Sequence, residues 1–206
     1  KSTLYRGNTT MSPPPLGYWP VEDGTDSTEI ASGIGGEPMQ LKGGTTQFAT
    51  NSTFVGSAPI AVSNASQWYA EIAGAPNTGT IQAVFLMQIA AAGETDLDSL
   101  FRINTSGSAA FWDLVYKSSS GGSLEIRAYD QDRIQILAVP MGFTNLNGLA
   151  VQVSIELVQN GADIDWNVIT LVPGAAFGGG AGGTLASRTV GACLGVMANQ
   201  YRQCTG

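Results

Sequence analysis

Apolar and polar residues alternate most clearly in the segment Leu149–Gln159, without a break from Val151 to Leu157, and no other feature of the sequence constrains the fold as strongly. The apolar residues of this segment are Val151, Val153, Ile155 and Leu157, and the polar residues between them are Gln152, Ser154 and Glu156. Successive side chains of a β-strand point to opposite faces, so a period of two places one set in a core and the other in water. The segment is therefore predicted to be a half-buried β-strand.

From residue 67 onward, the chain repeats this pattern in short segments. Clusters of Gly, Asn, Asp or Ser separate most of them, as is typical between the strands of antiparallel sheets. The other predicted strands of this region are Gln67–Ile72, Thr80–Ala90, Leu100–Thr105, Ala110–Lys117, Ser123–Asp130, Arg133–Val139, Ile164–Leu171 and Val190–Met197. Three earlier candidates are Leu16–Gly24, Met39–Leu41 and Pro59–Val62.

The turns between these strands indicate that neighbouring strands run antiparallel. Asp130-Gln131-Asp132 is predicted to close one tight hairpin, and Asn160-Gly161 to begin another, because Asn-Gly favours hairpin turns with positive φ. No window of eleven or more residues carries the apolar stripe of an amphipathic helix. We therefore predict an all-β fold, a sandwich of two packed antiparallel sheets.

The domain boundaries follow from length and from Pro and Gly content. Residues 1–15 end in three prolines and are predicted to be a linker or the tail of a preceding domain. Residues 16–206 have the length of one large sandwich domain. Within it, the run Gly174–Gly183 is predicted to be a flexible loop tip, because glycine weakens strands.

Charge and hydrophobicity exclude two classes of partner. The net charge is −7, and the 9 basic residues are scattered, so no basic stripe can neutralise nucleic-acid phosphates. An anionic membrane surface is disfavoured for the same reason. The longest apolar run, Ala83–Ala92, is broken by Gln88 and is about half the ~20 residues that a membrane-spanning helix needs. We expect neither nucleic-acid binding nor membrane insertion.

The sequence also lacks the residues of common catalytic sites. There is no His, which removes Ser-His and Cys-His pairs and histidine-ligated zinc. Glycosidases need two carboxylates facing one groove, whereas Glu125 and Glu156 each stand alone on their predicted strands. The chain is therefore expected to be no enzyme and to need no cofactor. The two cysteines, Cys193 and Cys204, are either unpaired or bridged to each other near the C-terminus.

Asp163 and Asp165 are the best candidates for a cation site. Two carboxylates at a spacing of two can converge on Ca²⁺, which takes six to eight oxygen ligands, and Asn160 and Gly161 lie beside them. The alternative is that these aspartates serve as turn residues that hydrogen-bond nearby backbone. Calcium is thus a possible ligand of this hairpin without further support from the sequence.

A polar face of the middle strands is the candidate glycan-binding surface. Alternation places Trp112 and its apolar neighbours inside, so that Asp113 points outside; the same argument places Arg127 and Tyr129 outside. With Arg102, these side chains are predicted to form a glycan-binding face, the alternative being an ordinary solvated sheet face. Trp112 and Trp166 are predicted to be core residues rather than sugar-stacking ones.

The order of several segments resembles a known group of domains. LGYWPVEDG at 16–24, followed by Ile30-Ala31-Ser32-Gly33 and Pro38-Met39, resembles the opening of laminin-G-like and concanavalin-like jelly-roll sandwiches. More narrowly, the chain resembles a domain of minor tail proteins from phages and prophages of actinobacteria. The further matching segments are LYRG at 4–7, LEIRAYDQD at 124–132, NGLAVQVSIELVQNGADIDWNV at 147–168 and TVGAC at 189–193.

This resemblance implies a structural or host-adhesion module of a phage tail, located in the extracellular virion. Its partners would be other tail proteins and host cell-wall polysaccharide. Similar sequences carry one more strand at the C-terminus, so residues 16–206 are expected to lack the closing strand of the sandwich. The alternative function is a carbohydrate-binding module of a secreted bacterial enzyme.

Overall fold

The computed structural model describes residues 15–19, 27–43, 46–47, 61–62, 66–89, 99–172 and 179–200. The chain divides into two compact units. One comprises the residues up to Ala73 and those from Gly195 onward, and the other is Gly74–Leu194. The single sandwich domain expected for 16–206, and the missing closing strand, both remain predictions.

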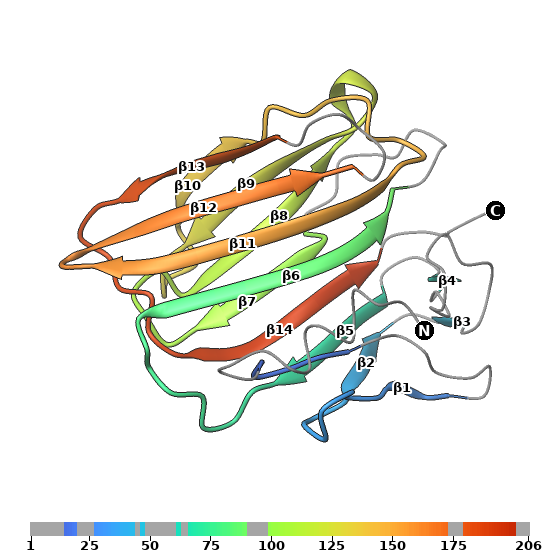
Figure 1. The fold of residues 1–206 in the computed structure, drawn as a ribbon, viewed down its shortest axis with the longest axis horizontal. Helices are drawn as coiled ribbons and strands as arrows, with labels where there is room; N and C mark the ends of the chain where they lie inside the picture. Colours follow the sequence, from blue (N-terminus) through green and yellow to red (C-terminus); the bar gives the residue numbers. More distant parts are fainter. Residues whose placement is uncertain are drawn as a thin grey trace. The chain divides into compact units, whose positions relative to one another are not determined.

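The unit Gly74–Leu194 is a sandwich of two antiparallel sheets (Figure 1). One sheet has the order β13-β12-β11-β6, and behind it in Figure 1 lie β7, β8, β9 and β10, also in that order. The strands are β6 (Thr80–Gln88), β7 (Phe101–Thr105), β8 (Phe111–Lys117), β9 (Ser123–Tyr129), β10 (Gln135–Pro140), β11 (Ala150–Asn160), β12 (Asp163–Leu171) and β13 (Gly179–Leu185). Within the described residues, the only helical segment is the 3-10 turn η1 (Ser119–Gly121). The predicted all-β class with antiparallel sheets is confirmed.

The core of this unit lies between the inner faces of the two sheets. Buried and less buried residues alternate along β9, and along most of β11 and β12, as the period of two predicts. Trp112 and Trp166 are 0% and 5% exposed, and their rings lie 6.4 Å apart across the sandwich, which confirms both as core residues. Phe85 and Phe101 stack between the sheets with centroids 4.3 Å apart.

Both predicted hairpins are present. At the β9–β10 turn, the Asp130 carboxylate accepts hydrogen bonds from the backbone amides of Asp132 and Ile134, at 3.0 and 2.9 Å. This bonding supports the positive φ of 62° at Arg133. At the β11–β12 turn, Gly161 takes a φ of 59°, which glycine adopts without strain.

The prediction of a loop over Gly174–Gly183 is wrong from residue 179 onward, because Gly179–Leu185 forms the regular strand β13. The glycines are needed for close approach. A Cβ at Gly179 would lie 2.3 Å from the Phe143 ring, and one at Gly180 would lie 2.3 Å from the carbonyl oxygen of Val168. The run therefore allows β13 to pack tightly where a side chain would not fit.

The other unit has strands in the order β1-β2-β5-β14, all antiparallel. They are β1 (Glu29–Ile30), β2 (Met39–Gly43), β5 (Ser66–Glu71) and β14 (Cys193–Gln200), and a separate pair joins β3 (Thr46–Gln47) to β4 (Ala61–Val62). Residues Gly195–Gln200 of β14 pair with β5. Trp68 of β5, which the sequence left unplaced, is fully buried.

The strand predicted at Leu16–Gly24 is wrong for its described part, Leu16–Trp19, which is irregular. The Trp19 ring folds back over Gly17, where a Cβ would lie 2.3 Å from the ring. The Trp19 indole also donates a hydrogen bond of 2.9 Å to the carbonyl of Glu37. These local contacts replace a strand ladder. Residues 20–24 lie outside the described residues.

No helix in the described part of the chain combines the length and hydrophobicity that crossing a bilayer would demand.

The close approach at Gly180 predicts the effect of a single methyl group. Gly180→Ala should lower the free energy of unfolding by about 1–3 kcal/mol, because the Val168 backbone must shift to admit the Cβ. Gly183→Ala on the same strand is the control, since its Cβ would make an ordinary contact of 3.4 Å with Trp166. Urea unfolding measures both; equal midpoints would contradict the packing role of Gly180.

Candidate functional site

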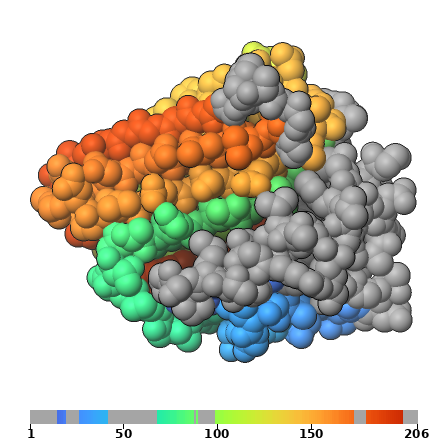
Figure 2. Space-filling model, in the orientation of Figure 1, coloured from blue at the N-terminus to red at the C-terminus, as the bar shows by residue number. Residues whose placement is uncertain are grey.

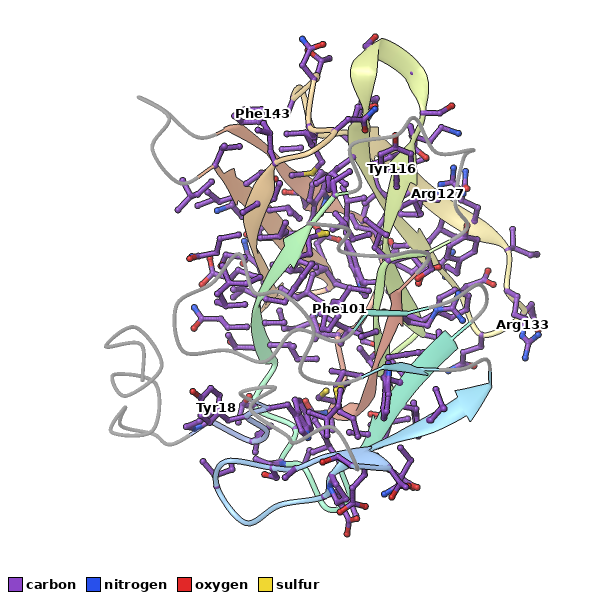
Figure 3. All side chains as sticks on the ribbon, turned by 90° about the vertical axis from the view of Figure 1, so that its right-hand side faces the viewer. Tyr18, Phe101, Tyr116, Arg127, Arg133 and Phe143 are labelled. Carbon is purple, nitrogen blue, oxygen red and sulfur yellow. The ribbon has the colours of Figure 1, made fainter. Side chains whose placement is uncertain are left out.

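Strand register brings the predicted glycan-binding residues together on the outer face of β7, β8 and β9. Arg102 of β7 lies opposite Asp113 of β8, and Asp113 lies opposite Arg127 of β9. Tyr129 lies two residues beyond Arg127 on the same face. We call this set, with Phe111 and Glu125, the charged row. Figure 3 shows Arg127 on the side of β9 away from the opposite sheet.

Asp113 corrects the expectation of a carboxylate exposed for ligand contact. Its side chain is on the predicted face but only 2% exposed. Arg102 holds it bidentately, with Nε 2.6 Å from Oδ1 and Nη2 2.8 Å from Oδ2, and the Ser99 hydroxyl donates to Oδ1 at 3.1 Å. A buried carboxylate needs such pairing to offset its lost hydration. Asp113 therefore positions Arg102 rather than facing solvent.

The aromatic part of the row is a stack of planar groups. The Arg102 guanidinium lies 4.4 Å from the centroid of the Phe111 ring. The Tyr129 ring stacks on Phe111 with centroids 4.6 Å apart and an angle of 14° between planes. At these distances the two groups occupy opposite faces of Phe111. The sequence analysis did not select Phe111, although it lies two residues before Asp113 and so shares its face.

Arg127 is fixed in the same way by its neighbours. Its Nε donates a hydrogen bond of 2.5 Å to Glu125 Oε1, and the two side chains are 21% and 18% exposed. Burial by itself lowers the pKa of Arg127. Hydrogen bonds and charge interactions with Glu125 and Tyr129 together outweigh this effect, so the pKa lies above its ordinary value. The guanidinium thus stays charged and held in place at the surface of the row.

The structure also shows a hollow that sequence reasoning did not find. It has a volume of ≈ 370 Å³ and is lined by neutral residues, among them Asn77, Ser106, Gly107, Gln159, Thr189 and Gly191. The Gln159 amide organises it, since Nε2 donates to the carbonyls of Gly161, Asp163 and Arg188 and Oε1 accepts from the Val190 amide. Two of these partners, Arg188 and Val190, lie 29 and 31 residues further along the chain, so the sequence did not reveal the hollow.

Asp163 and Asp165 lie on one face of β12, and their oxygens are engaged by protein donors. Asp163 Oδ1 accepts from the Ser187 amide at 2.8 Å. Asp165 accepts from Thr184 Oγ1 at 2.7 Å and from Asn160 Nδ2 at 2.8 Å. Among the described residues, no three His, Cys, Asp or Glu side chains form a group suited to a metal ion. The calcium site remains a prediction to which this geometry adds no support.

The predicted Cys193–Cys204 bridge is not tested, because Cys204 lies outside the described residues. Cys193 is buried at the start of β14, with 6% exposure.

No protein-family model and no curated protein sequence matches the chain. Among solved structures, a similar chain occurs in the crystal structure of basic winged bean lectin with Tn-antigen. The two chains are 12% identical, with a TM-score of 0.40, over 89% of this chain and 87% of that chain. A likeness of this degree assigns neither a family nor a function.

Removing the Asp113 charge should destabilise the protein, because Arg102 would lose its bidentate partner. Asp113→Asn is expected to lower the free energy of unfolding by about 1–3 kcal/mol, a value reduced by the partial exposure of Arg102. Asp132→Asn, an exposed change with the same loss of charge in the β9–β10 turn, should change it by less than about 0.5 kcal/mol. Thermal and urea unfolding compare them, and a neutral Asp113→Asn would overturn the positioning role.

Hydrogen bonds from Thr184 and Asn160 lower the pKa of Asp165 from its ordinary 3.8. Because the pKa is lower in the folded state, the stabilisation is complete above pH 3.8 and is lost as pH falls through the folded value. Carboxyl NMR should give a midpoint below 3.8 in the wild type, moving toward 3.8 in Thr184→Val. A wild-type midpoint at or above 3.8 would contradict this assignment.

Proposed function

We propose that this chain is a non-enzymatic structural and adhesion module of a phage tail, a concanavalin-like jelly roll that binds host cell-surface glycan through the charged row. The tail setting rests on the order of sequence segments that resemble actinobacteriophage minor tail proteins. The binding role rests on one observation: two guanidinium groups are held by carboxylates beside a Phe111–Tyr129 stack on one outer sheet face.

This arrangement supports a binding role because its groups are already ordered. Asp113 fixes Arg102 and Glu125 fixes Arg127, so a ligand loses little side-chain entropy when it binds them. Arg127 and Arg102 keep 21% and 29% of their side chains exposed, which leaves part of each side chain in reach of a ligand.

The chemistry of the row favours a sugar chain over an ion. Two cations and two anions make its formal charge zero, so hydrogen bonding and contact area must supply the affinity. Phe111 is covered on both ring faces, by Arg102 and by Tyr129, which leaves Tyr129 as the aromatic ring for contact with the apolar face of a sugar. Glycans offer the matching combination of hydroxyl groups and C–H faces.

The proposal predicts which side chains carry glycan affinity. The purified chain should bind host cells and their extracted wall polysaccharide, and Arg127→Ala or Tyr129→Ala should weaken binding at least about tenfold. Asn167→Ala is the matched control, because Asn167 is an exposed residue of β12 on the opposite sheet. Glycan arrays and calorimetry measure affinity, and thermal unfolding confirms that each variant is folded.

Three results would contradict parts of this proposal. Equal loss of affinity in Asn167→Ala would remove the charged row from the binding site. Strong binding to a storage or plant polysaccharide, with none to bacterial walls, would favour the alternative of a carbohydrate-binding module from a secreted enzyme. Failure of antibodies against the chain to label tail ends of purified virions would overturn the tail role.

A further inference from the structure

Strand β13 has an open edge. It pairs with β12 along its whole length, from Ile164↔Leu185 to Thr170↔Gly179, and it ends the strand order of its sheet among the described residues. Figure 1 shows β13 beyond β12 at the border of the sheet, and Figure 2 shows the same strand along one rim of the visible surface. In an antiparallel pair, alternate residues turn their N–H and C=O groups away from the neighbour. Those of β13 therefore face outward.

This edge lacks the features that normally prevent strand addition. Proteins protect edges with charged residues, prolines, bulges or very short strands. β10, an edge of the other sheet in this unit, has a bulge between Gln135 and Leu137 and ends at Pro140. In contrast, β13 is seven residues long, has the sequence GGAGGTL and keeps regular register with β12.

We propose that β13 binds β13 of a second copy of this chain, antiparallel around a twofold axis, so that the two four-stranded sheets become one continuous sheet. Such an interface is self-complementary, as closed dimers require. Gly180 and Gly182 place no side chain on the outer face, and Thr184 is the only residue of β13 that has one there, so this face offers little obstruction to a second β13.

Charge favours a second copy in this antiparallel orientation. The chain carries a net charge of −7, so two copies repel each other wherever acidic surfaces meet, but β13 contains no charged residue. Asp165 lies beside Thr184 at one end of β13, and Ile169 lies beside Gly180 at the other end. Antiparallel pairing places the acidic end of each copy next to the aliphatic end of its partner and keeps the two Asp165 side chains apart.

Exposed aliphatic side chains extend the same surface. Ile169 and Leu171 on β12 are each 43% exposed, and Val84 on β6 is 58% exposed. Val84, Ser154, Ile169 and Gly180 lie in one row across the sheet. In the antiparallel pair, the side chain that lies across Gly180 from Ile169 is Thr184 of the second copy, so the added contact is mainly that of one methyl group and most of the affinity comes from backbone hydrogen bonds.

Light scattering on the 206-residue chain tests the dimer directly. The mass should rise with concentration, between about 1 and 200 µM, from the 21.3 kDa of one chain toward twice that value. Hydrogen exchange should show that the outward amides of β13 are protected at high concentration and exchange rapidly on dilution. A mass of 21.3 kDa throughout, or β13 protection independent of concentration, would overturn the proposal.

Two consecutive proline substitutions form a matched pair. Since alternate residues of β13 bond to β12, one of Ala181→Pro and Gly182→Pro removes a ladder bond, and the other removes only an outward donor. The variant that keeps the wild-type unfolding midpoint should weaken self-association at least about tenfold. Gln82→Lys, an exposed change on β6 at the far edge of the same sheet, should dimerise normally. A folded proline variant that dimerises like wild type would refute the role of β13.

Discussion

The contact between Trp112 and Trp166 is the interaction on which the unit Gly74–Leu194 depends, since it joins the inner faces of its two sheets. Neither indole N–H has a hydrogen-bond partner among the described residues, which costs about 1–3 kcal/mol for each group. Burying roughly 200 Å² of each side chain contributes about 5 kcal/mol at ~25 cal/mol per Å². Apolar burial outweighs the unmet hydrogen bonds, so both rings stay inside.

Burial of Trp112 in the core also determines which residues of β8 lie on the outer face of the sheet. Its neighbours in β8, Phe111 and Asp113, must point to the opposite face, and antiparallel register then aligns them with Tyr129 and Arg127 of β9. A shift of one residue would exchange the tryptophan with the carboxylate. The charged row is therefore a consequence of core packing as much as of its own ion pairs, and a stable core keeps the row ordered.

The sequence predicted features that depend on local pattern: the alternation in β11, the two hairpins, and the burial of Trp112 and Trp166. Prediction from the sequence failed where the local structure depends on contacts with segments distant in the sequence. β13 is a strand because it pairs with β12, and its glycines are needed because Phe143 and the Val168 carbonyl leave no room for side chains at Gly179 and Gly180. Alternation assigned Asp113 to the correct face but could not show its depth, which depends on Arg102 and Ser99. The Gln159 network depends in part on Arg188 and Val190, which are far from Gln159 in the sequence.

The charged row differs in its chemistry from an ordinary ionic surface. Arg102 and Arg127 each form an ion pair with a neighbouring carboxylate, and the chain as a whole is acidic. Long-range attraction therefore cannot supply the affinity for a partner. The row instead presents a defined shape, because contacts within the protein hold the planar guanidinium and aromatic groups at fixed distances. Under the proposed function, recognition would depend on matching hydroxyl positions and ring faces, so a neutral, rigid sugar fits the proposal better than a flexible polyanion.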